Sequence, residues 1–62
     1  MKILEYFEYK HLPDNLQSVS KQFHDLAHNL VDLMPARTDQ QEVALQKLLE
    51  AKDAAVRAFL PI

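Results

Sequence analysis

Apolar side chains recur along this chain with the period of a helix. Between residues 14 and 34 they alternate steps of three and four, which is the heptad spacing of a helix that packs along another helix: Leu16, Val19, Phe23, Leu26, Leu30 and Leu33. Between residues 39 and 60 the apolar arc is broader, with alanines along one edge and larger aliphatic residues along the other. The pattern predicts long helices over residues 14–34 and 39–60.

The segment from Met34 to Thr38 separates the two patterns and predicts a tight connection. Pro35 has no backbone N–H and disfavours a helical conformation at Met34, so the first helix should stop there. Thr38 with Gln41 matches a capping box at the start of the second helix. A connection this short predicts an antiparallel helical hairpin.

The first twelve residues differ in character from the rest. Ile3, Leu4 and Phe7 have helical spacing, which predicts a short helix over residues 2–8, with a strand as the alternative. Such a short helix does not persist alone and has to pack on the hairpin or on another subunit. Asp14 with Gln17 matches a second capping box where the first long helix begins.

Composition narrows both fold and function. Sixty-two residues make a single domain, 1–62, and there are no cysteines to form disulfides. Hydrophobic residues make up 48% of the chain, which is more than a two-helix hairpin can bury. We therefore expect an all-α fold assembled into a homo-oligomeric helical bundle. The absence of Gly excludes P-loop and Rossmann nucleotide sites. No apolar run is long enough for a membrane span and no secretory signal is visible, so we expect a cytoplasmic protein.

A net charge of −2 and a pI near 5.8 argue against sequence-blind binding of nucleic-acid polymers, but they leave room for a small anion at clustered cations. His24 and His28 stand four apart in HDLAH, which resembles a zinc-protease motif. The chain has too little material for a third ligand and a cleft, so we expect no metal site. Lys21 and Gln17 share this flank, which either holds a phosphate or is simply a solvated helix face.

Three further groups could either bind a ligand or have a purely structural role. Lys52 falls inside the apolar arc, where it must reach solvent, pair with a carboxylate or meet an anion. Arg57 has Asp53 as an i,i+4 partner. Tyr9, Lys10 and His11 precede the first long helix, where Tyr9 can stack on a base beside cationic neighbours or merely pack on the hairpin.

A family resemblance extends from Tyr9 to Ala58. The strings YKHLP, LQSVSKQFHDLAHNLV, LMPARTDQQEVAL and LLEAKDAAVRA resemble the small phage helical-hairpin proteins of the anti-CBASS and Thoeris anti-defence type. The resemblance implies a sponge in the host cytoplasm that binds cyclic nucleotide immune messengers intact. It therefore implies no enzyme activity and no cofactor.

In such proteins hexamers hold cyclic dinucleotides, such as cyclic GMP-AMP, in pockets between subunits. Some members bind cyclic trinucleotides at a separate site, and others bind cyclic ADP-ribose derivatives. The resemblance implies that Tyr9 with Lys10 stacks on a base, that Lys21 or His24 contacts phosphate, and that Arg57 belongs to the second kind of site. The competing hypothesis, from the heptad seam, is a dimeric four-helix bundle that binds RNA or a protein.

Overall fold

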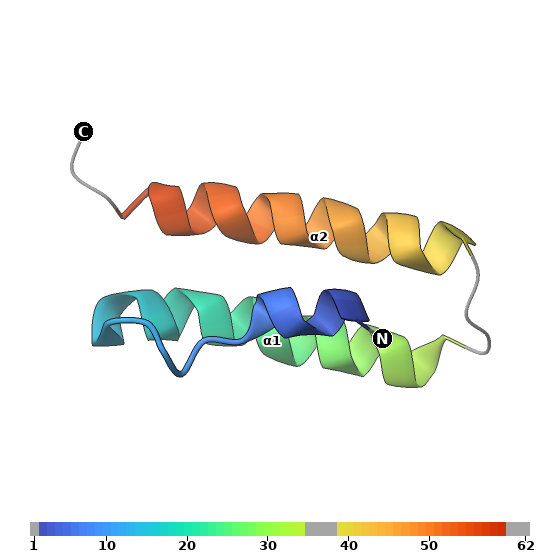
Figure 1. Ribbon diagram of the computed structural model, residues 1–62, viewed down its shortest axis with the longest axis horizontal. Helices are drawn as coiled ribbons and strands as arrows, with labels where there is room; N and C mark the ends of the chain where they lie inside the picture. The colour runs from blue at the N-terminus through green and yellow to red at the C-terminus, as the bar shows by residue number, and fades with distance from the viewer. Residues whose placement is uncertain (1, 35–38, 60–62) are drawn as a thin grey trace.

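The computed structural model describes residues 2–34 and 39–59, and the regular secondary structure over these residues is all helical, with no strand. A short 3-10 helix, η1 (Lys2–Phe7), is followed by two α-helices, α1 (Asp14–Leu33) and α2 (Asp39–Arg57). The two long helices lie antiparallel, and η1 packs against both (Figure 1). The predicted short helix and helical hairpin are thus confirmed. Within the described part of the chain, no helix is long and apolar enough to cross a membrane.

Helix η1 docks through one deeply buried side chain. A 3-10 helix places residues three apart on one side, so Leu4 and Phe7 face the hairpin together. Phe7 is completely buried, and Ile3 and Leu4 pack against the same core. Six residues cannot hold a helix by themselves, so these apolar contacts keep η1 in place.

The core lies slightly to one side of the predicted heptad seam. Its fully buried apolar residues are Phe7, Ala27 and Leu45. Leu26 and Leu33, which the seam placed inside, are 45% and 78% exposed. A heptad pattern predicts an apolar stripe, but it does not show which flank of that stripe is covered within one chain. Here η1 covers only the flank of α1 opposite Leu26 and Leu33. Because we expect this seam to pack against helices of other subunits as well, the burial of Leu26 and Leu33 stays a prediction.

The end of α1 follows from the proline after it. The helix ends at Leu33, and Met34 is extended with φ −73° and ψ 130°, while its amide still donates to the Leu30 carbonyl at 3.0 Å. This conformation is the one that a following proline favours. The remainder of the predicted connection, including the Thr38 cap, lies outside the described residues.

Helix α2 ends earlier than the predicted residue 60. Its last helical residue is Arg57, after which the Phe59 amide donates to the carbonyl three residues back, on Val56, at 3.1 Å. Such i→i−3 bonds tighten a final turn and satisfy a carbonyl that the α-helix leaves without a partner. The predicted last helical residue, Leu60, lies outside the described residues.

The charged residues of α2 make other contacts than the sequence suggested. Lys52 is buried, and its ammonium donates a hydrogen bond to the backbone carbonyl of Tyr6. The sequence suggested that this ammonium would reach solvent, a carboxylate or an anion. Its partner is instead a backbone carbonyl of η1. Among the described residues, the predicted ion pair of Asp53 with Arg57 does not form.

Candidate functional site

The joint between η1 and α1 is held in shape by a glutamine. The amide nitrogen of Gln17 donates to the carbonyls of Leu12, at 2.7 Å, and Lys10, at 3.3 Å. A turn in which the Leu12 amide donates to the Tyr9 carbonyl at 3.0 Å completes the joint. One side chain of α1 therefore fixes the loop that carries Tyr9.

The predicted capping box at the start of α1 was wrong. Pro13 occupies the N-cap position, and no side chain makes a capping hydrogen bond there. Gln17 does reach back, but to carbonyls, whereas a capping box would need it to accept from a backbone N–H. The Asp14 carboxylate is consequently not used for capping.

Three rings form a ladder along one flank of α1. Tyr9 meets His24 edge to face, with ring centroids 5.1 Å apart and planes at 69°. His24 in turn lies 4.4 Å from His28, with planes at 43°. The i,i+4 spacing of the histidines sets the second contact, and the fixed joint sets the first. His28 also has a buried Nε2 without a hydrogen-bond partner.

Asp25 links the ladder to Lys21. The Lys21 ammonium donates to Asp25 Oδ2 at 2.9 Å, and His24 Nδ1 lies 3.1 Å from Asp25 Oδ1. The hydrogen bond from Lys21, followed by that from His24, lowers the pKa of Asp25 below its usual value. The same bond to Asp25 raises the pKa of Lys21. Both side chains are exposed, so the pair organises the surface and adds little stability.

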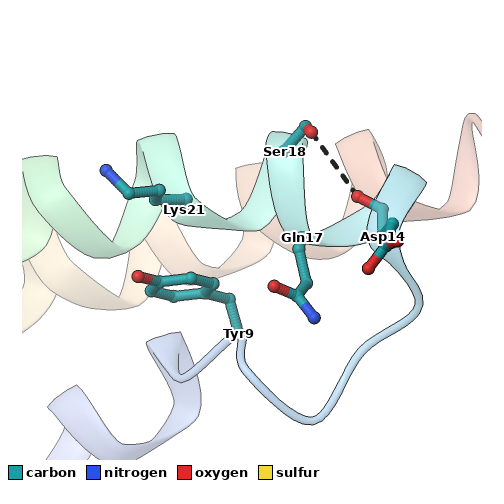
Figure 2. A pocket seen from close by; sticks show the side chains of 5 residues that line it. All are labelled: Tyr9, Asp14, Gln17, Ser18 and Lys21. Atoms are coloured by element: carbon teal, nitrogen blue, oxygen red, sulfur yellow. Dashed lines mark hydrogen bonds between the residues drawn. The ribbon is translucent and has the colours of Figure 1, made fainter.

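A shallow pocket of about 300 Å³ opens beside this cluster (Figure 2). It is lined by an aromatic ring, a cation, a carboxylate, an amide and a hydroxyl: Tyr9, Lys21, Asp14, Gln17 and Ser18. Figure 2 shows the Tyr9 ring under α1, below the Lys21 side chain, with Gln17 and then Asp14 further to the right. The pocket can therefore accept a flat ring together with polar groups at both ends.

The structure gathers some of the predicted site residues and leaves others apart. Tyr9, Lys21, His24 and His28 form one connected cluster. The side chains that do not join this cluster or line the pocket are those of Lys10, His11 and Arg57, all of them exposed.

Two acidic residues of the site were missed by sequence reasoning. Asp25 was seen only as part of HDLAH, although its i,i+4 spacing from Lys21 was a usable signal. Asp14 was interpreted as a cap, and nothing in the sequence showed that it would line a pocket with Tyr9.

No group of three or more His, Asp or Glu residues in the described part of the chain is arranged to hold a metal ion. The residues that line the pocket offer stacking, hydrogen bonding and charge. Comparisons with models of protein families, with curated proteins and with solved structures found no match. What the chain does must be inferred from its own residues.

Proposed function

We propose that this protein is a cyclic nucleotide sponge, which binds cyclic oligonucleotide immune messengers without cleaving them and so acts as a phage anti-defence protein. The observation that carries the proposal is the pocket in which Tyr9 and Lys21 lie together. A base can stack on an aromatic ring while a cation meets its phosphate, and stacking is worth about 1–3 kcal/mol per base. The resemblance described above points to the same ligand class.

The size of the pocket supports a shared site. About 300 Å³ is at the small end for a ligand pocket, and this one is open to solvent. It suits one half of a cyclic dinucleotide. A ligand with two bases matches a twofold interface, in which two subunits each contribute one pocket. We therefore propose a homo-oligomer, with a hexamer favoured and a dimer as the alternative.

The other predicted residues have places in this proposal. Lys10 and His11 are exposed next to Tyr9, where they are available to phosphate or to a second subunit. His24 contacts the Tyr9 ring edge to face, and His28 packs against His24. Arg57, exposed at the end of α2, stays the proposed contact of a separate site for a cyclic trinucleotide.

The test is calorimetry with a panel of cyclic dinucleotides, cyclic trinucleotides and cyclic ADP-ribose isomers, followed by chromatography of the released ligand. We expect binding of at least one compound, weaker binding at higher salt, and recovery of the ligand intact. Absence of binding across the panel, or recovery of a cleaved product, would reject the sponge.

A pair of tyrosine variants tests the site itself. Tyr9→Ala should weaken binding about tenfold or more, because it removes the stacking surface. Tyr6→Ala is the matched control, since Tyr6 is 61% exposed on η1 and its contact with Lys52 uses only the backbone carbonyl. Equal affinity of Tyr9→Ala and wild type would remove Tyr9 from the site.

A second candidate is a dimeric four-helix bundle that binds RNA or a protein partner. Exposed apolar residues on α1, Leu26 and Leu33, favour a bundle of some kind. A mass of two subunits, together with a retarded RNA band and no cyclic nucleotide binding, would favour this candidate.

A further inference from the structure

The pocket beside Tyr9 has different hydrogen-bonding character at its two ends. Lys21 supplies a donor at one end. At the other end Gln17 uses its amide nitrogen to hold the carbonyls of Leu12 and Lys10, so its oxygen is left as an acceptor. In Figure 2 this oxygen lies on the side of the Tyr9 ring.

Asp14 adds a stronger acceptor at the same end. Its backbone carbonyl accepts from the Ser18 hydroxyl at 3.4 Å, but among the described residues no donor pairs with its carboxylate. Asp14 lines the pocket together with Tyr9 and Gln17, and Figure 2 shows Gln17 between the other two. A ligand that stacks on Tyr9 and extends towards Asp14 therefore passes the Gln17 oxygen and then the carboxylate, and donors on the ligand would satisfy both acceptors.

We propose that the pocket selects guanine and that Asp14 recognises the base. This inference rests on the proposed cyclic nucleotide function and names the base that the ligand carries. Guanine presents two adjacent donors, N1–H and the N2 amino group, on its Watson–Crick edge, and a carboxylate can accept both. Adenine presents one amino donor beside an acceptor nitrogen, which faces the carboxylate unfavourably.

An acidic residue in the first turn of a helix also has a structural role, because it interacts favourably with the helix dipole. That role affects stability and does not distinguish one base from another. A change in base preference on substitution of Asp14 therefore separates recognition from helix stabilisation.

The experiment is calorimetry of the full chain with cyclic di-GMP, cyclic GMP-AMP and cyclic di-AMP. We expect wild type to bind cyclic di-GMP at least about tenfold more tightly than cyclic di-AMP, with the mixed ligand between them. Asp14→Asn should lose most of this preference, because the new amide presents donors of its own to the donors of guanine. Asp32→Asn, which removes the same charge from the exposed far end of α1, should keep it.

The outcomes separate this inference from the proposed function. If wild type binds the guanine and adenine ligands equally, or if Asp14→Asn keeps the preference, the role of Asp14 is rejected while the sponge stands. If wild type binds no cyclic dinucleotide, the inference fails. Circular dichroism of both variants checks that their folded populations are comparable with that of wild type.

Discussion

At the scale of single residues, Asp25 is the group that pairs with the cation of the candidate site. It holds the Lys21 ammonium at 2.9 Å, so a phosphate that approaches Lys21 has to compete with a carboxylate already in place. Since the pair is exposed, water and salt screen it, and exchanging one anion for another costs little. A readily exchanged partner suits a site that binds ligand reversibly.

The pH dependence of this pair can be measured directly. The Lys21 hydrogen bond lowers the pKa of Asp25, so its small contribution to stability is present above the ordinary value of 3.8 and is lost as pH falls through the lower folded value. For Lys21, whose pKa is raised, the contribution is present below 10.5 and is lost as pH rises beyond it. We expect the Asp25 carboxyl to titrate below 3.8 by nuclear magnetic resonance.

Removal of the lysine supplies the control. Lys21→Gln should move the Asp25 midpoint upwards, because it deletes the largest cause of the shift. Lys47→Gln, at an exposed position on α2, should leave it in place. If the Asp25 midpoint is the same in Lys21→Gln and wild type, the ion pair between Lys21 and Asp25 does not persist in solution.

At the scale of elements, the position of η1 determines whether the site exists. Tyr9 is separated from η1 only by Glu8, and η1 is held by the buried Phe7 ring and by the hydrogen bond from the Lys52 ammonium to the Tyr6 carbonyl. If η1 left the hairpin, the Tyr9 ring would lose its place against His24. The N-terminal helix is therefore needed to form the candidate site, although none of its residues lines the pocket.

Alanine variants of two adjacent aromatic residues test this dependence. Phe7→Ala should lower the free energy of unfolding by about 3–5 kcal/mol, because Phe7 is completely buried. Tyr6→Ala should change it by no more than about 0.5 kcal/mol, because Tyr6 is largely exposed. Urea denaturation measures both variants, and similar losses in the two would mean that η1 is not docked through Phe7.

The sequence predicted the elements well because helical periodicity and proline act locally. Met34 is extended because Pro35 follows it, and no distant contact is needed to know this. The partner of Lys52 could not be predicted in the same way. It is a backbone carbonyl 46 residues away, and a pattern of side chains along one helix carries no information about another element's main chain.

Only those features of the candidate site that depend on local helix geometry were predicted from the sequence. The histidines and Lys21 share a flank because of helix geometry, which the sequence gives directly. The role of Gln17 depends on the path of residues 10–12, and a capping pattern suggested the wrong partner. Asp14 lines the pocket only because that path brings Tyr9 next to it.

At the scale of the whole molecule, the single chain leaves much apolar surface uncovered. Among the described residues, Tyr6, Leu33 and Phe59 are 61%, 78% and 53% exposed. Leu26 and Leu33 lie on the flank of α1 away from His24 and His28, and a depression of about 220 Å³ beside Leu26 is lined by Gln22 and Phe23. A 62-residue chain with so small a core would gain stability if another copy of the chain covered this flank.

The proposed oligomer predicts the mass in solution and a variant that disrupts it. Light scattering should give wild type a mass well above 7.2 kDa, with six subunits, about 43 kDa, favoured. Leu26→Glu should lower this mass, because it places a charge on the apolar flank of α1 that we expect to be covered. Tyr6→Glu, at an exposed position on η1, should leave it unchanged. A wild type that stays monomeric at the concentrations used for calorimetry would exclude a ligand site shared between subunits, and the pocket beside Tyr9 would then have to bind a single nucleotide half on its own.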